Sequence, residues 1–193
     1  MIRIATKEDI PAILDIYAPY IQNTTATFEY TVPTEAEFTA RFQGVTRQFP
    51  WLVWEEDGLV LGYAYGSAPF ERAAYQWCAE LSVYLAPQIQ GKGIGKMLYT
   101  ALEKLLYLQG YRVLYALICD ENDASIGFHK KMGYKTVTAM PRCGVKFGRW
   151  IGIIYMEKRA DSVEIPSFSP ISFPDFVHSN RKELEFLAIL SLP

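Results

Sequence analysis

Hydrophobic residues recur along the chain at two spacings, and each spacing predicts one kind of secondary structure. Apolar side chains three or four positions apart predict amphipathic helices, of which the clearest carries Ile94, Leu98, Ala101, Leu102, Leu105 and Leu108. Gly110 directly follows this stripe and is expected to end the helix. Short alternating or wholly apolar runs predict strands instead. Two such runs, residues 51–56 and 59–66, flank Asp57 and Gly58, which predicts a hairpin with this pair at its turn.

The predicted elements alternate between strands and helices through the second half of the chain. Strands are expected at residues 2–5, 51–56 and 59–66, from about 78 into a glycine-rich turn, and at 111–118, 134–139 and 150–157. Helices are expected from residue 8 or 9 to about 21, from 34 to about 44, from 94 to 109 and from 122 to 132. This order predicts an α/β fold, in which helices cover a mixed sheet.

Residues 161–193 differ in composition from the preceding 160. A chain of 193 residues, half of them hydrophobic, is large enough for one buried core, so we expect residues 1–160 to form a single domain. The remainder alternates serine and proline with phenylalanine, and a helix is predicted over residues 180–190, with the apolar positions Leu184, Leu187, Ile189 and Leu190. These side chains are too apolar for a free linker, and we expect this tail to pack on the main body or on a partner subunit.

Charge and cysteine usage exclude several classes of protein. The net charge is −2, and the basic residues are dispersed, so no nucleic-acid footprint is visible. The three cysteines are odd in number and lack both CxxC and Cys/His metal spacing, which indicates reduced thiols in a cytoplasmic protein without a bound metal. The charged N-terminus does not resemble a signal peptide, and no apolar run reaches the roughly 18 residues of a membrane span.

A glycine-rich turn joins the strand that begins near residue 78 to the next helix. Its sequence from residue 90 to 95 is Gln-Gly-Lys-Gly-Ile-Gly, and Lys96 follows. Glycines let successive backbone N–H groups point into one concavity at a helix N-terminus, where the helix dipole favours an anion. The turn is therefore a candidate pyrophosphate site, although an ordinary strand-to-helix turn has the same composition.

Two familiar phosphate motifs do not fit this turn. A P-loop would require glycine at position 90 and serine or threonine at 97, where the chain has Gln90 and Met97. The dinucleotide pattern G-x-G-x-x-G, begun at Gly91, would require glycine at position 96, which is Lys96.

The turn resembles instead the pyrophosphate loop of the GCN5-related N-acetyltransferases (GNAT), in which Gln or Arg is followed by two residues, Gly, one residue, and Gly or Ala. Gln90, Gly93 and Gly95 match this pattern. A second match runs from Asn122 to Tyr134, with N-x-x-S, an aromatic position and a closing Gly-Tyr. The two matches follow in order about 30 residues apart, the length of a βαβ crossover. A capped helix explains the ends of the second segment, but not the arrival of both motifs in order.

This resemblance implies a fold, a co-substrate and a set of contacts. The family fold is a mixed, mostly antiparallel sheet, flanked by helices, whose two central strands splay apart so that the pantetheine arm of acetyl-CoA enters between them. Backbone N–H groups at the splay would donate to the pantetheine amides and to the oxyanion. The residues expected to bind acetyl-CoA are Val83, Tyr84, Leu85, Gln90, Gly91, Lys92, Gly93, Ile94, Gly95, Lys96, Asn122 and Lys131.

More narrowly, residues 2 to about 158 look like the branch that acetylates phosphinothricin, methionine sulfoximine and methionine sulfone. An α-amine must lose a proton before it attacks a thioester, and Glu80 stands where this branch places a catalytic glutamate. A salt-bridged carboxylate at a strand end is the structural alternative for Glu80. His129 occupies the position of the family's general acid, where this branch also carries histidine and where it would serve as acid or base. A histidine on the helix surface without a catalytic role is the alternative there.

The acceptor pocket is expected to contain Phe28, Arg72 and Tyr75, which match substrate-lining positions of the branch. Arg72 could hold a substrate carboxylate in a bidentate fork, although a solvated surface arginine is the plain alternative. The chain departs from the pattern at Gly152, where the relatives usually have an acidic residue. This departure leaves the exact acceptor open.

Other functions stay open at this point. The small-molecule acceptor could be a polyamine or an antibiotic, or the acceptor could be a protein N-terminus, and a non-catalytic acyl-CoA sensor would need no placed base. A cationic or extended acceptor would predict an acidic or open groove, and the set Phe28, Tyr75 and Trp77 does not look acidic. A homodimer is expected from the resemblance alone, with neither a nucleic acid nor a membrane as partner.

Overall fold

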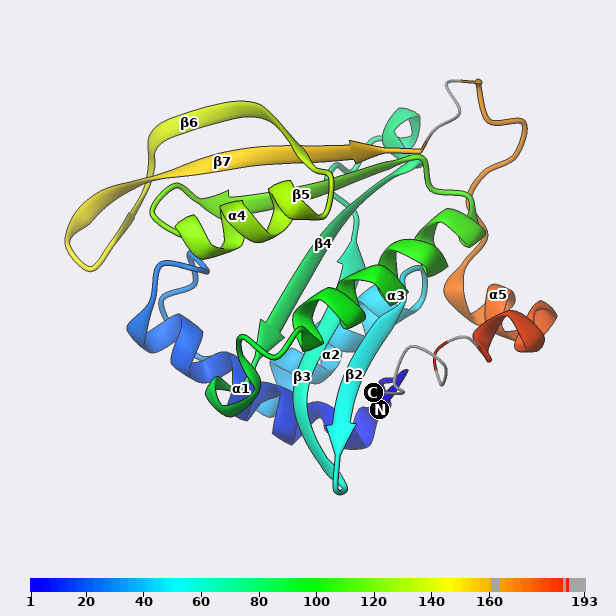
Figure 1. Cartoon of the computed structure of the whole chain (residues 1–193), viewed down its shortest axis with the longest axis horizontal. Coiled ribbons are helices and arrows are strands. Elements are labelled where there is room, and N and C mark those ends of the chain that lie inside the picture. Colours follow the sequence, from blue (N-terminus) through cyan, green and yellow to red (C-terminus); the bar gives the residue numbers. More distant parts are fainter. Residues whose placement is uncertain (161–163, 186, 188–193) are drawn as a thin grey trace.

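The chain folds around one seven-stranded sheet with the strand order β1-β2-β3-β4-β5-β7-β6 (Figure 1). The structure, a computed structural model, describes residues 1–160, 164–185 and 187. Every neighbouring pair of strands is antiparallel except β4 and β5, which run parallel. The predicted fold class, a mixed and mostly antiparallel sheet flanked by helices, is confirmed.

The element bounds follow the predicted order closely. The strands are β1 Ile2–Ile4, β2 Trp51–Glu56, β3 Leu59–Ser67, β4 Cys78–Leu85, β5 Val113–Cys119, β6 Lys135–Lys146 and β7 Arg149–Arg159. The α-helices are α1 Ile10–Asn23, α2 Glu35–Thr46, α3 Ile94–Gln109, α4 Asp123–Lys131 and α5 Phe173–Ser179, and short 3₁₀ turns lie at Lys7–Asp9, Ala73–Tyr75, Pro87–Ile89 and Arg181–Leu184.

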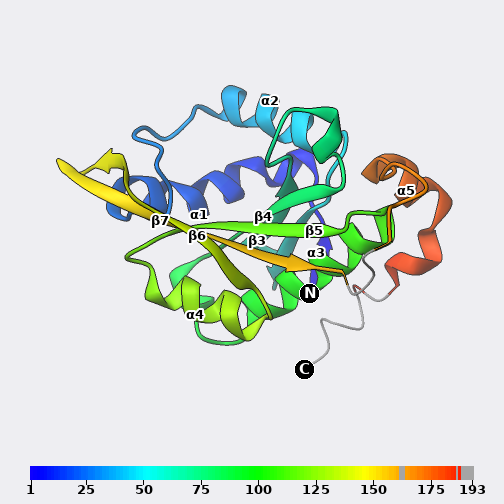
Figure 2. The same ribbon diagram turned by 90° about the horizontal axis from the view of Figure 1, so that it is seen from above.

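Helices α1 and α2 lie on one face of the sheet, and α3 and α4 lie on the other (Figure 2). On one face α2 packs its phenylalanines on β2, where the ring of Trp51 lies 5.9 Å from that of Phe38 and 5.1 Å from that of Phe42. On the other face the predicted stripe of α3 is buried at Leu98, Leu102 and Leu105 and faces the sheet, while Leu108 is exposed. Burial of these apolar surfaces supplies most of the stabilisation of the fold.

Strands β4 and β5 pair over only three residues each. Cys78, Ala79 and Glu80 pair with Val113, Leu114 and Tyr115, and the two strands then diverge. Figure 1 shows β4 running away from β5 towards α1. Beyond Glu80 no strand of the described part of the chain pairs with this side of β4, which is the splay implied by the family resemblance.

The last hairpin is longer than predicted. Strand β6 was expected to end near residue 139 but continues to Lys146, because an irregularity between Met140 and Gly144 accommodates Pro141, Arg142 and Cys143 without ending the pairing with β7. The second half of β6 was not predicted, because its proline and glycine interrupt the alternation of apolar and polar residues. The far end of the β6–β7 hairpin projects beyond the helices (Figure 1).

The tail also differs from its prediction. Helix α5 occupies Phe173–Ser179, ahead of the expected helix, with Ser172 as its N-cap and Pro174 in its first turn, where proline is tolerated. A 3₁₀ turn at Arg181–Leu184 follows, whereas Ile189 and Leu190 lie outside the described residues. The helix at residues 173–179 was not predicted, because the stretch is rich in serine and proline and Ser172 is its main sign of a helix start.

The tail packs on the main body rather than standing free. Phe173 and Phe176 are buried, and the Phe173 N–H donates to the Gln48 carbonyl at 3.1 Å. Gln109, at the end of α3, exchanges two hydrogen bonds of 2.9 Å with the backbone of Ile171. Among the described residues, no helix is long and apolar enough to cross a membrane.

Candidate active site

The backbone of β4 turns alternate residues towards the gap that β5 leaves. The Ala86 N–H donates to the Leu61 carbonyl at 2.8 Å, so in the ladder with β3 the hydrogen-bonded pairs are Tyr84 with Tyr63 and, two residues back, Ser82 with Tyr65. The N–H and C=O groups of Val83 and Leu85 therefore face the gap. The Tyr84 N–H, expected to bind acetyl-CoA together with those of Val83 and Leu85, pairs with β3 instead and does not face the gap.

A cavity of about 310 Å³ follows this gap. The residues that line it come from β4, β5 and α4, and from the glycine-rich turn: Leu81, Val83, Leu85, Ala116, Ile118, Cys119, Asn122, Ser125, Phe128, His129, Gln90 and Gly95 are among them. The cavity thus joins the splayed strands to both motifs recognised in the sequence. Val83 and Leu85 turn backbone amide groups towards it, which suits an extended ligand that carries amides.

The glycine-rich turn has the backbone shape that its sequence predicts. Gly91 and Gly93 adopt positive φ values of 74° and 83°, which other residues rarely adopt, and α3 begins directly afterwards at Ile94. A Cβ at Gly95 would lie 3.2 Å from Leu85 Cδ1, so the turn packs closely on the end of β4. Lys92 and Lys96 are exposed beside the helix N-terminus, where they add positive charge for an anion.

Of the other residues predicted to bind acetyl-CoA, Asn122 and Gln90 line the cavity and Lys131 does not. Asn122 caps α4, because its Oδ1 accepts from the Ser125 N–H at 3.0 Å, and it lines the cavity. The Gln90 side chain points back to the end of β4, where its Nε2 donates to the Leu85 carbonyl at 3.2 Å. Lys131 lies at the exposed far end of α4 and is not among the residues that line the cavity.

Glu80 stands at the vertex of the splay. It pairs with Tyr115 in the last pair of the β4–β5 ladder, and alternation along β4 turns its side chain to the face that carries α1. Burial raises the pKa of the Glu80 carboxyl, and among the described residues no cation or hydrogen-bond donor offsets this effect. The salt-bridged alternative is therefore not what the structure shows.

His129 is buried on the opposite face and both of its ring nitrogens are engaged. Nδ1 lies 2.8 Å from the Ser125 carbonyl, which can only accept, so Nδ1 carries the proton. Nε2 lies 2.8 Å from the Tyr99 hydroxyl and accepts from it. Burial lowers the pKa of His129 and favours this neutral form. The histidine is not on the helix surface, but it offers no free proton to the cavity.

The predicted acceptor residues lie in two separate places, and none of them lines the cavity of about 310 Å³. Phe28 lies in the loop between α1 and α2, where its ring takes the place of a side chain at Gly144 of β6: a Cβ there would lie 2.3 Å from Phe28 Cε2. Tyr75 contacts Phe70, which contacts Tyr115, with ring centroids 4.7 and 6.0 Å apart. Arg72 is exposed next to Tyr75.

Sequence reasoning missed the residue that anchors the Phe28 loop. Lys146 is buried at the end of β6, and its Nζ donates to the Thr27 carbonyl at 2.6 Å. The Tyr30 hydroxyl donates to the Val145 carbonyl on the same strand. Only the tertiary structure shows that Val145 and Lys146, at the end of β6, hold this loop.

The absence of a side chain at Gly152 leaves room for the carboxylate of Asp120, which directly follows β5. The Gly152 N–H donates to Asp120 Oδ1 at 3.2 Å, and a Cβ at position 152 would lie 2.2 Å from Asp120 Oδ2. An acidic group therefore lies where a side chain at position 152 would begin. The missing acidic residue is replaced in space by Asp120.

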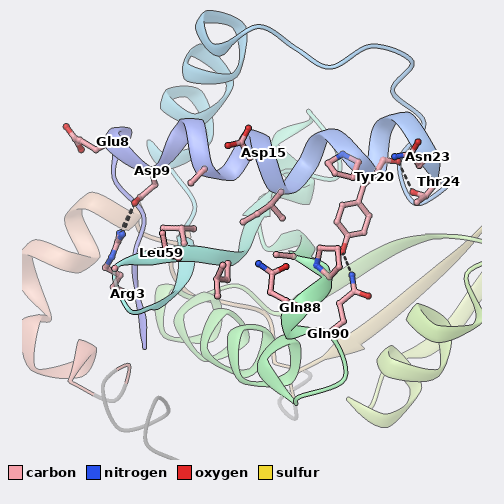
Figure 3. Close-up of a pocket in the computed structure, with 18 residues that line it drawn as sticks. Arg3, Glu8, Asp9, Asp15, Tyr20, Asn23, Thr24, Leu59, Gln88 and Gln90 are labelled. Carbon is pink, nitrogen blue, oxygen red and sulfur yellow. Dashed lines mark hydrogen bonds and ion pairs between the residues drawn. The ribbon is translucent and has the colours of Figure 1, made fainter.

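A larger cavity lies elsewhere, between α1 and the end of the β3 and β4 pair (Figure 3). Its volume is about 670 Å³, and Ile16, Pro19 and Leu61 form much of its apolar wall. His129 and residues of both motifs line the smaller cavity, which is therefore the candidate site. Glu80 lines neither cavity and stands at the vertex of the splay. No group of three or more metal-ligating side chains occurs among the described residues.

Comparison with known proteins agrees with this geometry. Residues 2–154 match the family model described as an acetyltransferase (GNAT) domain. An L-methionine sulfoximine/L-methionine sulfone acetyltransferase of Pseudomonas paraeruginosa is 40% identical over 164 residues, which cover 83% of this chain and 94% of that protein. A phosphinothricin N-acetyltransferase of Alcaligenes faecalis is 38% identical over 159 residues, with 81% of each chain covered.

A solved structure extends the likeness to three dimensions. The phosphinothricin acetyltransferase of Sinorhizobium meliloti, in complex with acetyl-CoA, superposes with a TM-score of 0.82 at 35% sequence identity, over 91% of this chain and 96% of that one.

The Asp120 carboxylate occupies the space that a side chain at position 152 would need, so substitutions at these two positions should have coupled effects on stability. Gly152→Ala should lower the free energy of unfolding by about 1–3 kcal/mol, because the new Cβ displaces the Asp120 carboxylate. Asp120→Ala should cost about 1 kcal/mol through the lost hydrogen bond. In urea unfolding the double variant should lose clearly less than the sum of the two losses. Strict additivity would show that the carboxylate does not occupy this space.

Proposed function

Because the chain belongs to the acetyltransferase (GNAT) family, and is therefore an N-acetyltransferase that uses acetyl-CoA, we propose that it acetylates the α-amine of a small amino acid or amino-acid analogue. The analogues we have in mind are of the phosphinothricin, methionine sulfoximine and methionine sulfone type. One observation carries the proposal: the half-buried Glu80 carboxylate, which has no counter-ion among the described residues, stands where the two central strands part, beside backbone groups that face the gap.

The residues of the cavity fit acetyl-CoA. We assign the pyrophosphate to the N–H groups of the glycine-rich turn and of the first turn of α3, because the positive φ values of Gly91 and Gly93 shape this turn as an anion cradle. The pantetheine amides would pair with the gap-facing groups of Val83, which have no strand opposite them. The same Val83 N–H is suited to stabilise the oxyanion that forms on the thioester carbonyl.

Glu80 is the general base in this proposal. The carboxylate takes a proton from the substrate ammonium, the neutral amine forms a C–N bond to the acetyl carbon, and the C–S bond breaks to release the CoA thiolate. A raised pKa makes this carboxylate a better proton acceptor than an ordinary surface glutamate, provided that the pH stays above it.

His129 has a supporting place in the same proposal. A neutral imidazole whose Nδ1–H donates to Ser125 and whose Nε2 accepts from Tyr99 cannot protonate the thiolate directly. A thiolate is a stable enough leaving group to take its proton from water, since a thiol pKa lies near 8.5. We therefore assign His129 the task of holding α4 and α3 together beside the cavity.

The surroundings of Glu80 favour a small acceptor over a polyamine. Tyr115 and Tyr155 lie side by side on the face that Glu80 shares, with ring centroids 4.9 Å apart, and Phe70 closes on Tyr115. An aromatic wall suits the short apolar part of an amino-acid analogue, whereas a polyamine would call for several carboxylates. Asp120, which stands in for an acidic residue at position 152, keeps the charge that the related enzymes have in this region.

We further propose a cytoplasmic homodimer. Cys78, Cys119 and Cys143 are free thiols, which supports a reducing compartment. Strand β6 is an exposed sheet edge, and Val137, Phe147 and Trp150 are exposed on its hairpin. A second copy of the chain would cover this apolar edge. Sedimentation at micromolar concentration should give twice the mass of 22.0 kDa, and a monomer would contradict the dimer.

The acceptor class is tested by thiol release from acetyl-CoA. Methionine sulfone, methionine sulfoximine and phosphinothricin should each support turnover, and their N-acetylated products should be detected by mass spectrometry. Spermidine, an aminoglycoside and a peptide N-terminus serve as acceptors of the competing classes. Turnover on one of these three, with none on the amino-acid analogues, would contradict the proposal.

The base is tested by paired substitutions. Glu80→Gln should lower kcat by about 10²- to 10⁴-fold, the usual contribution of a positioned base, whereas the exposed Glu56→Gln serves as the matched control and should change it little. His129→Asn should lower kcat by less than about tenfold if its role is structural. A loss at His129→Asn as large as that at Glu80→Gln would assign the base to the histidine.

The pH profile adds a second test of Glu80. Because burial raises its pKa above that of an ordinary glutamate, kcat should fall as the pH drops through this raised value, when the carboxylate becomes protonated. The acid limb should be absent from Glu80→Gln, whose residual rate needs no ionised carboxylate there. A wild-type acid limb that persists unchanged in the variant would exclude Glu80 as its source.

A further inference from the structure

One hydroxyl group ties the end of β4 to the start of the glycine-rich turn. The Tyr20 hydroxyl donates to the Leu85 carbonyl at 2.7 Å and accepts from the Leu85 N–H at 3.3 Å. It also accepts from Gln90 Nε2 at 3.1 Å, and this contact is visible in Figure 3. Tyr20 and Gln90 line both the acetyl-CoA cavity and the larger cavity beneath α1, so this contact forms part of the wall between them.

The hydroxyl replaces a neighbouring strand at this position. Leu85 is the last residue of β4, and its N–H and C=O face the gap that β5 has left. Backbone groups without partners in such a place cost free energy and let the strand end move. Tyr20 satisfies both groups of Leu85, while those of Val83, two residues earlier, still face the gap.

Gln90 is held by the same contacts. Its amide donates to Tyr20 and to the Leu85 carbonyl, so the first residue of the glycine-rich turn is fixed to the strand end on its other side. The side chain of Gln90 is thereby directed away from a pyrophosphate. Its role in the motif becomes that of fixing the shape of the turn, whose N–H groups remain for the ligand.

The same tyrosine reaches the acceptor side through its helix. Tyr20 lies in the last turn of α1, and the Thr24 hydroxyl donates to the Tyr20 carbonyl at 2.7 Å. Thr24 in turn accepts from the Ala26 N–H at 3.2 Å at the start of the loop that carries Phe28. The Tyr20 ring also meets Tyr84 edge-on at 5.1 Å. The donor turn and the acceptor loop thus share one anchor.

We propose that Tyr20 is a positioning residue for acetyl-CoA, which holds the end of β4 and the Gln90 turn in their binding arrangement before the ligand arrives. The inference rests on the acetyl-CoA site described under the proposed function. It goes beyond that site, because Tyr20 belongs to neither recognised motif. Preorganisation of this kind increases affinity by removing the cost of ordering the turn on binding.

Tyr20 could instead compete with acetyl-CoA for the backbone groups of Leu85, and an experiment can distinguish this role from positioning. If the hydroxyl merely blocked Leu85, acetyl-CoA would have to displace it, and removal of the hydroxyl would strengthen binding. If Tyr20 prepares the site, removal of the hydroxyl frees the strand end and the turn together, and binding weakens.

Calorimetry with CoA tests this on the whole chain without any acceptor. Tyr20→Phe should raise the Kd for CoA about tenfold, the effect of losing one to two hydrogen bonds. Tyr111→Phe is the matched control, because its hydroxyl accepts from Gln48 Nε2 at 3.0 Å at the other end of the molecule, and its Kd should stay within about twofold of wild type. An unchanged or lower Kd for Tyr20→Phe would overturn the proposal.

A cycle with Gln90 sharpens the test. Gln90→Ala should also raise the Kd, and the double variant should be no weaker than the weaker single variant, because both changes break the same contact. In steady state Tyr20→Phe should raise the KM for acetyl-CoA and leave kcat within about threefold, unlike Glu80→Gln. Independent, additive losses would overturn the shared anchor. CoA binding with the predicted pattern but no amino-acid turnover would reject the acceptor proposal alone.

Discussion

The divergence of β4 from β5 after Glu80 is the constraint on which the rest of the site depends. A parallel pair of strands normally satisfies the backbone groups of both along their length, and here the pairing stops after three residues. Two consequences follow at once. Backbone groups of Val83 and Leu85 face a cavity rather than a strand, and the glutamate at the vertex is partly buried without a counter-ion. An extended amide-containing ligand and a proton acceptor thus meet at one point of the sheet.

The fold supports this opening from both sides. Tyr20 replaces the missing strand at Leu85, and the tight turn at Gly91 and Gly93 places the N-terminus of α3 beside the same strand end. On the acceptor side, Lys146 and Tyr30 fix the Phe28 loop to β6. The pKa shifts follow the same logic. Burial raises that of Glu80 and lowers that of His129, and each shift favours the neutral form of a group in a poorly solvated site.

Sequence alone predicted the elements and the donor motifs, because these depend on local spacing. The stripe of α3, the glycine-rich turn and the cap at Asn122 can each be recognised from a few neighbouring residues. Contacts between distant segments were not predictable in this way. The Tyr20 to Leu85 bonds join residues 65 positions apart, and Asp120 meets Gly152 across 32 positions. The continuation of β6 past Pro141 was not predicted because the proline and glycine within it suggested irregular structure, and the helix at Phe173 was not predicted because of the proline in its first turn.

A crystal structure with CoA and an N-acetylated amino-acid product would locate both reaction products relative to the splay of β4 and β5. We expect the pantetheine arm to lie between β4 and β5, with an amide paired to Val83, the pyrophosphate on the turn from Gly91 to Gly95, and the product nitrogen within reach of Glu80. CoA bound instead in the larger cavity beneath α1, or a product nitrogen remote from Glu80, would contradict this expectation.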